Sequence, residues 1–243
     1  VTLHYLAYNV DGKVVVSGST KKPKIKVIVS KDDVSTWYDI NLVDGKYNEV
    51  IWLIDGKGIY KVSVVVHEYD RVYSYGPTVE VNNTVDVNKF LVPTKHVESN
   101  NAEIIELAKS ITQNYTTSRE KAYAIYDWVY KNIEYDYDKY LKQLNKNFDN
   151  EYGALNTLKT KKGVCYDYSA LLAALGRAAG LQVKVIKGNF VNYYRNELHA
   201  WNEIYIPEGD RWINVDATFA YSLGTNYFDN ADFYRDHEKI SEY

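Results

Sequence analysis

The sequence predicts an all-β sandwich of immunoglobulin-like type followed by an α+β domain. The first 85 residues contain short strand patterns between turn signals and no helical pattern. Apolar stripes at helical spacing begin after residue 100, and strand patterns return towards the C-terminus. We therefore expect a β-sandwich domain over residues 1–85 and an α+β domain over residues 86–243, each large enough to bury a core.

Alternation of apolar and polar residues predicts the strands of the first domain. Residues 24–29 and 60–64 place apolar side chains on one face and polar side chains on the other, as in a half-buried strand. Asp-Gly pairs and a Gly-Pro pair separate these patterns and are good turn formers. The expected strands are residues 13–17, 24–30, 37–42, 47–53, 59–67 and 78–81. Since the chain has one cysteine, hydrophobic packing rather than a disulfide must hold this domain.

Apolar stripes and capping signals predict the first helices of the second domain. Residues 102–112 carry isoleucine, leucine and alanine on one face. Thr117 and Glu120 resemble a capping box and open a second helix. Residues 135–150 are polar and rich in asparagine and tyrosine, so we expect a long loop there. A short helix over residues 154–159 follows.

The single cysteine, Cys165, falls at the start of the next predicted helix. Leu171, Leu172 and Leu175 form the buried stripe of that helix, and Gly180 suits the position just after its end. Free N–H groups and the helix dipole favour a thiolate at such an N-terminus, and the same N–H groups can form half of an oxyanion hole. Alternatively, Cys165 is a small buried hydrophobe, as most free cysteines are.

A hairpin that follows this helix brings two further reactive groups together. The expected strands are residues 182–188, 199–206 and 212–218. If residues 207–210 form the turn, Ile206 lies opposite Arg211. His199 and Asp216 are then diagonal neighbours on one face, about 7–8 Å apart at the backbone. A turn one residue longer would direct Asp216 to the other face.

Cys165, His199 and Asp216 together are the parts of a nucleophilic site. In such a site an imidazole activates the thiol and a carboxylate orients the imidazole. Each residue alone has an ordinary structural explanation: a small buried side chain, a satisfied histidine, a carboxylate at a strand end. The combination with compatible geometry favours catalysis.

Four motifs in order resemble the transglutaminase-like superfamily of papain-like cysteine enzymes. They are GVCYDYS at residues 163–169, LQVKVIKG at 181–188, HAWNEIYI at 199–206 and WINVDAT at 212–218. The resemblance covers residues 102–219 and implies that Cys165 is the nucleophile, His199 the base and Asp216 the orienting group. Ala217 stands where the family usually has proline, which removes a rigid residue but no reacting group.

The resemblance also implies an aromatic or amide donor, upstream of the cysteine, that completes the oxyanion hole. Tyr135 is the candidate, because the segment around it resembles the end of the family's preceding helix. Tyr137 and Tyr152 are alternatives, and each of the three has an ordinary role in packing or on the surface. Trp201, beside His199, either shields the His–Asp pair from water or fills the core.

The implied reaction is acyl transfer through a thioester on Cys165. We expect a cysteine hydrolase, a peptidase or amidase, that acts on protein or peptide amides. A crosslinking protein-glutamine transglutaminase is the second hypothesis, because the sequence does not distinguish water from an amine as the acceptor. A noncatalytic surface binding module is the third, favoured by the 25 tyrosines and the leading β-sandwich.

Composition limits the partners. The single cysteine excludes a cluster of thiolate metal ligands, and we expect no cofactor and no metal. A net charge of −3 provides no drive towards nucleic acid or an anionic membrane, so the expected partner is a protein or peptide substrate, with cell-wall association as an option. An immunoglobulin-like domain ahead of such a catalytic domain resembles secreted or surface-anchored bacterial proteins, so we expect an extracellular or cell-surface location, with no signal in this chain.

Overall fold

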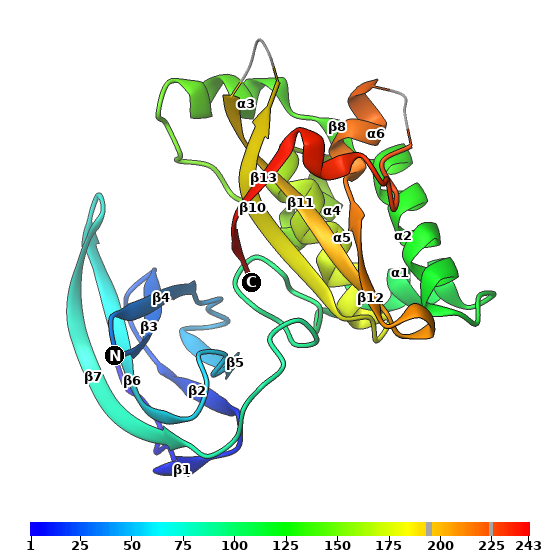
Figure 1. The fold of residues 1–243 in the computed structure, drawn as a ribbon. Helices are drawn as coiled ribbons and strands as arrows, with labels where there is room; N and C mark the ends of the chain where they lie inside the picture. The colour runs from blue at the N-terminus through cyan, green and yellow to red at the C-terminus, as the bar shows by residue number, and fades with distance from the viewer. Residues whose placement is uncertain (193–195, 224–225) are drawn as a thin grey trace. The chain divides into compact units, whose positions relative to one another are not determined.

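The chain forms two compact units, Val1–Asn88 and Lys89–Tyr243 (Figure 1). The computed structural model describes residues 1–192, 196–223 and 226–243. The division falls close to the expected one between residues 85 and 86. Among the described residues, no helix has the length and apolar character needed to cross a bilayer.

The first unit consists of two β sheets that share one hydrophobic core. Its strands are β1 (Asn9–Val10), β2 (Lys13–Ser19), β3 (Ile25–Lys31), β4 (Val34–Asp39), β5 (Lys46–Trp52), β6 (Gly58–Tyr69) and β7 (Val72–Asn83). One sheet has the order β1-β7-β6-β3-β4 and the other pairs β2 with β5. Val16 and Ile51 of the small sheet belong to the same buried cluster as Val27 and Val62 of the large one. An all-β unit is therefore present, and its immunoglobulin-like type remains a prediction.

Two strands of this unit begin earlier than expected. β7 begins at Val72 instead of residue 78, so the Gly76-Pro77 pair, expected as a turn, lies within the strand. β4 begins at Val34 instead of residue 37, because Lys31 pairs with Val34 across a two-residue turn. Asp32 occupies the left-handed region in that turn, with φ of 50°. Aspartate tolerates this conformation better than most residues, so the Asp32-Asp33 pair also indicates a turn. The sequence prediction missed this turn because it relied on Asp-Gly and Gly-Pro pairs.

The second unit places helices on an antiparallel sheet. Its helices are α1 (Ala102–Thr112), α2 (Ser118–Asn132), α3 (Tyr137–Leu144), α4 (Ala154–Thr160), α5 (Cys165–Ala178) and α6 (Ala217–Leu223), with 3₁₀ turns η1 (Pro207–Gly209) and η2 (Phe233–Arg235). Its strands are β8 (Glu134–Tyr135), β9 (Lys162–Gly163), β10 (Val183–Val191), β11 (Asn196–Ile206), β12 (Arg211–Val215) and β13 (His237–Glu242). The main sheet has the order β12-β11-β10-β13, and β8 pairs with β9 in parallel.

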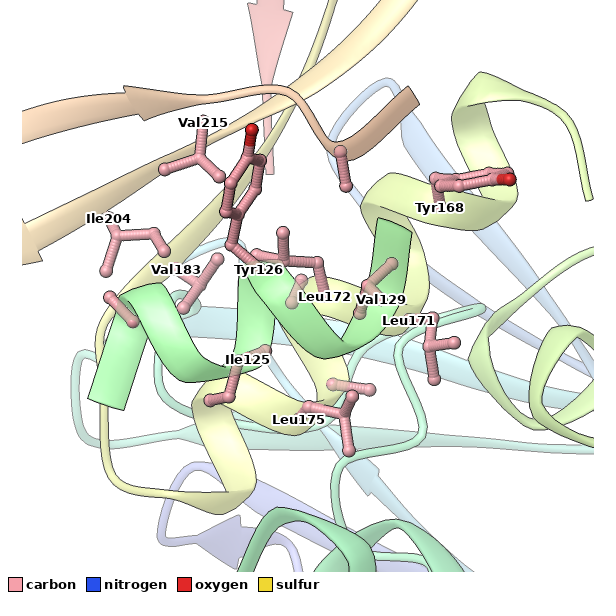
Figure 2. Close-up of a cluster of buried hydrophobic side chains, with 14 of the residues drawn as sticks. Ile125, Tyr126, Val129, Tyr168, Leu171, Leu172, Leu175, Val183, Ile204 and Val215 are labelled. Carbon is pink, nitrogen blue, oxygen red and sulfur yellow. The ribbon is translucent and has the colours of Figure 1, made fainter. Parts of the chain in front are cut away.

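Helix α5 lies in the centre of this unit, between the other helices and the sheet (Figure 2). Its side chains from Asp167 to Arg177 are all buried. The labelled cluster combines side chains of α2, α5 and the sheet: Ile125, Tyr126 and Val129; Tyr168, Leu171, Leu172 and Leu175; Val183, Ile204 and Val215. Burial of so much apolar area is the main source of stability here.

Two polar contacts fix the position of α5 along strand β11. The Ser169 hydroxyl donates to the carbonyl oxygen of Trp201 over 2.7 Å. The Asn202 amide donates to the carbonyl oxygen of Ser169 over 3.0 Å. Because buried polar groups need partners, these bonds favour one alignment of the helix against the strand. The start of α5 therefore has a defined position relative to the middle of β11.

The prediction of a long loop over residues 135–150 is wrong, because most of these residues belong to the short strand β8 and helix α3. Asp136 caps α3 by accepting from the backbone N–H of Lys139 over 2.9 Å. Lys139 is buried and pairs with the carboxylate of Asp167 in α5 at 2.7 Å. The contact that stabilises α3 thus lies 28 positions away in the sequence. The pattern of apolar residues could not reveal this contact, since the residue that α3 buries is a lysine.

The expected strand over residues 212–218 ends early, at Val215. Asp216 ends it by accepting from the backbone N–H groups of Thr218 and Phe219 over 2.8 and 3.0 Å. This is the arrangement of a helix N-cap, and it opens α6. Helix α6 was not predicted. Its N-cap is Asp216, whose carboxylate was predicted to be part of the reactive site.

We expect Lys139→Ala to destabilise the second unit by about 3–5 kcal/mol, because it leaves the buried Asp167 carboxylate without its counter-charge. Urea unfolding followed by tryptophan fluorescence measures the change. Lys142→Ala, on the exposed side of the same helix, is the matched control and should unfold nearly as the parent does. Equal midpoints for the two variants would contradict a stabilising role for the Lys139–Asp167 pair.

Candidate active site

Cys165 is the first residue of the buried helix α5. The segment before it is held by Asp167, whose carboxylate accepts from the backbone N–H of Val164 over 2.9 Å and of Gly153 over 3.2 Å. Gly163 packs so closely on this side chain that an added Cβ would lie 2.5 Å from the Cβ of Asp167. A larger residue at position 163 would therefore displace the turn that delivers Cys165 to the helix start.

His199 and Asp216 form a direct hydrogen bond. Their Nε2 and Oδ2 atoms lie 2.6 Å apart, and both side chains are almost completely buried. The strand pairing has Ile206 opposite Arg211, which is the register expected from the turn length. The structure thus places the side chains of His199 and Asp216 within hydrogen-bonding distance. Their expected diagonal backbone positions allowed this contact but did not require it.

Cys165 completes a linear series with this pair. Its thiol and the His199 side chain line the same pocket, and the interaction with the sulfur contributes to the raised pKa of His199. Because Nε2 of His199 is bonded to Asp216, the other ring nitrogen, Nδ1, is left for the sulfur. The three residues come from a helix start, a strand and a strand end, and the structure brings all of them together.

Charge pairing dominates the electrostatics of the site. Burial by itself lowers the pKa of His199, but the negative charge of Asp216 and the bonds to Asp216 and Cys165 outweigh it and raise the pKa to about 10. Burial likewise tends to raise the pKa of Asp216, but the charge and hydrogen bond of His199 hold it well below its usual range. At neutral pH the site therefore favours an imidazolium between a carboxylate and the sulfur.

Aromatic rings exclude water from the His–Asp pair. Phe219 stacks on His199 with ring centroids 4.6 Å apart and an interplanar angle of 22°. Trp201 lies on the same ring at 6.1 Å, and is itself only 1% exposed while packing on Phe233. Trp201 thus has both of the roles considered for it, as a shield for His199 and as part of the core.

Cys165 and His199 line one pocket of about 490 Å³. Most of the other lining side chains are aromatic or aliphatic, among them Phe190, Leu198 and Phe219. A mainly apolar cavity with a few convergent polar groups is typical of a ligand site. The reactive residues are therefore accessible to a substrate even though Asp216 is not.

Of the three tyrosines considered as oxyanion donors, Tyr135 lines the pocket together with Cys165. It pairs through its backbone with Gly163, two residues before Cys165. Burial, followed by the charge of Cys165, raises its pKa, so the phenol remains a donor across the neutral range. Tyr137 also lines the pocket, whereas Tyr152 packs against the rings of His96 and Tyr166 instead.

The structure adds one residue that the sequence reasoning missed, His237. Its Nε2 atom lies 3.5 Å from Oδ2 of Asp216. No motif marked it, because it lies 21 positions after Asp216 at the start of a strand with no clear alternation. Only the packing of β13 against β10 brings it to the site.

His199, Asp216 and His237 are a conceivable metal-binding group, since their candidate ligand atoms lie within 4.8 Å of one another. Donors on one tetrahedral zinc ion would be roughly 3.3 Å apart, given metal–ligand bonds near 2.0 Å. The 2.6 Å between His199 and Asp216 is shorter than this and suits a shared proton. The arrangement fits a hydrogen-bonded chain better than a metal centre.

Comparison with known proteins identifies a family for this region. The model of the transglutaminase-like superfamily matches residues 105–217. An uncharacterized protein of Haemophilus influenzae is 28% identical over 135 residues, which are 53% of this chain and 35% of that protein. Human kyphoscoliosis peptidase is 29% identical over 126 residues, which are 49% of this chain and 18% of that protein. The chain thus corresponds to about a third of one curated relative's length and less than a fifth of the other's.

A solved structure was also found to be similar. A protein from Cytophaga hutchinsonii, provisionally named a cysteine protease, aligns with a TM-score of 0.45 and 17% identity. The alignment covers 95% of this chain and 88% of that chain.

We expect Asp216→Asn to slow alkylation of Cys165 by iodoacetamide at about pH 7 by roughly tenfold or more. The substitution removes the negative charge that raises the pKa of His199. The imidazolium, which now persists up to about pH 10, would lose its proton at lower pH and stabilise the thiolate less. Mass spectrometry measures the rate at the single thiol of the chain.

The matched control for this experiment is Asp127→Asn on α2, whose carboxylate pairs with Lys131 at the surface. It should be alkylated at the parent rate. An unchanged rate in Asp216→Asn would show that Asp216 does not control the charge of His199.

Proposed function

We propose that the protein is a cysteine hydrolase, a peptidase or amidase, from the premise that residues 105–217 form a domain of the transglutaminase-like superfamily. This domain confirms the family and the fold class that the four sequence motifs predicted. The observation that carries the proposal is the series Cys165, His199 and Asp216 at one pocket. The proposed substrates are amides of proteins or peptides.

The first half of the reaction forms a thioester. The Cys165 thiolate adds to the amide carbon, and the carbonyl electron pair moves to oxygen. N–H groups at the start of α5 and the Tyr135 hydroxyl would stabilise this oxyanion. As the C–N bond breaks, its electron pair goes to nitrogen, which receives the proton of His199 and leaves as an amine.

The second half regenerates the thiol. His199, now neutral, takes a proton from water while the oxygen adds to the thioester carbon. The C–S bond then breaks, the acid product leaves, and the thiolate–imidazolium pair forms again. Asp216 remains ionised throughout and holds the ring through Nε2, so that Nδ1 faces the sulfur.

The name of the human relative, a peptidase, supports hydrolysis over crosslinking. The alternative is that a lysine amine takes the place of water and a crosslink forms. Both reactions use the same thioester, so only the acceptor distinguishes them. An extracellular or cell-surface setting, with protein or cell-wall partners, is part of the proposal and rests on the order of the two domains.

Incubation with casein and a fluorescent primary amine tests the choice. We expect new peptide termini or released ammonia, little amine incorporation, and loss of both products in Cys165→Ala. Amine incorporation that depends on Cys165 would instead assign a transglutaminase. Absence of any product, together with iodoacetamide labelling of Cys165 no faster than that of a free thiol, would assign a noncatalytic module.

We expect Tyr135→Phe to lower the rate of thioester formation by about 10²-fold, because it removes one donor to the oxyanion. The alkylation of Cys165 by iodoacetamide develops no oxyanion, so its rate should change little. Tyr137→Phe is the matched control, since its ring packs on Tyr135 with centroids 5.0 Å apart and lines the same pocket. A larger loss in Tyr137→Phe than in Tyr135→Phe would assign the donor to Tyr137.

A further inference from the structure

His237 is a buried histidine in direct proximity to the orienting carboxylate. Its side chain is completely buried, and its ring stacks on Phe233 with centroids 3.8 Å apart. Phe219, Trp201 and Tyr227 surround it at 5.1 to 6.4 Å. A polar ring in such an apolar enclosure is costly unless its nitrogens interact with polar groups.

The contacts of its Nδ1 atom define which nitrogen carries a proton. Nδ1 lies 3.0 Å from the carbonyl oxygen of Phe233 and 2.7 Å from a carboxylate oxygen of Asp236. Both partners are acceptors, so Nδ1 is a donor. Asp236 is partly exposed, with 36% of its side chain accessible, and connects this buried ring to the surface.

The Nε2 atom of His237 points to Asp216. It lies 3.5 Å from Oδ2 and has no partner at ordinary hydrogen-bond distance. A lone pair directed at a carboxylate oxygen would be repelled, whereas an N–H would be attracted.

The reaction cycle creates a need for such a group. Asp216 is 1% exposed, and its Oδ1 atom is occupied by the N–H groups of α6. Its Oδ2 atom is bonded to His199, which carries positive charge only until it gives its proton to the leaving amine. From then until the thiolate forms again, the buried carboxylate faces a neutral ring, and an unpaired buried charge is strongly unfavourable.

We propose that His237 is a positioning residue that holds Asp216 through the approach of its Nε2 atom to Oδ2. It keeps Asp216 ionised and in place during the half of the cycle in which His199 is neutral, and so makes it easier for His199 to release its proton. This inference rests on the proposed roles of Cys165, His199 and Asp216. The charged or titratable groups around His237 are Asp216, His199, Asp236 and Tyr227.

Two amide substitutions separate this role from packing. His237→Asn keeps a donor near the position of Nδ1 but leaves nothing at Nε2, whereas His237→Gln places an N–H near Nε2. Both lose the stacking on Phe233, and only His237→Gln retains a donor towards Asp216, so a milder effect in His237→Gln than in His237→Asn reports the contact with Asp216. His4→Asn, at an exposed histidine of the first unit, is the control for sample handling and for the assignment of histidine signals in the NMR spectrum.

The first measurement is the NMR titration of the His199 ring in a Cys165→Ala background, which needs no substrate. We expect the midpoint to rise by about one pH unit in His237→Asn, because neutralising His199 then leaves Asp216 unpaired. In His237→Gln the midpoint should lie between those of the parent and His237→Asn. Equal midpoints in all three proteins, or a lower one in His237→Asn, would overturn the proposal.

The second measurement compares two reactions of proteins that retain Cys165. We expect iodoacetamide alkylation at about pH 7 to stay within roughly twofold of the parent in His237→Asn, because alkylation needs the thiolate but no proton from His199. Casein hydrolysis should fall by about tenfold and recover in part in His237→Gln. Equal loss of both reactions in both variants would indicate a structural role alone. If Cys165→Ala shows that no hydrolysis occurs, the titration still decides the role of His237.

Discussion

Burial of helix α5 on every side is the constraint on which the second unit depends. A helix without an exposed face must be covered by other helices and by a sheet, and here α1, α2 and α4 lie on it together with β10 and β11. The bonds between Ser169 and strand β11 then remove the freedom to slide. Cys165 therefore begins a helix that is packed on every side, against the strand that carries His199.

Two buried carboxylates have parallel roles around this helix. Asp167 accepts backbone N–H groups before Cys165 and pairs with Lys139, while Asp216 accepts backbone N–H groups of α6 and pairs with His199. Each thus combines a structural task with an ion pair. The difference lies in the partner, because a lysine keeps its proton, whereas an imidazole can give its proton away. That difference makes one pair structural and the other suited to chemistry.

The site is a series of polar side chains that runs from the pocket to the surface: Cys165, His199, Asp216, His237 and Asp236. Its inner members are enclosed by aromatic rings, where attraction between charges is stronger than in water. Such an enclosure stabilises the imidazolium when it is paired and penalises the carboxylate when it is not. Under the proposed mechanism, the same apolar surroundings favour both a charged His199 beside the thiol and a second polar partner for Asp216.

The sequence by itself determined the features that depend on neighbouring residues. The capping box of Thr117 and Glu120 opens α2, Gly180 follows α5 with φ of 83°, and the turn length sets Ile206 opposite Arg211. These depend on local hydrogen bonds, backbone sterics and register, which are readable within a few residues. The order of the motifs further placed Cys165, His199 and Asp216 in one family pattern.

Only the tertiary structure decided the features that depend on distant contacts. Helix α3 depends on a lysine that pairs with α5, the distinction between Tyr135 and Tyr152 depends on the pairing of β8 with β9, and His237 reaches the site through β13. In each case a polar residue is buried by a partner far away in the chain. The periodicity of apolar residues indicates which apolar side chains are buried. It gives no indication of polar side chains that are buried because they hydrogen-bond or pair with a distant residue.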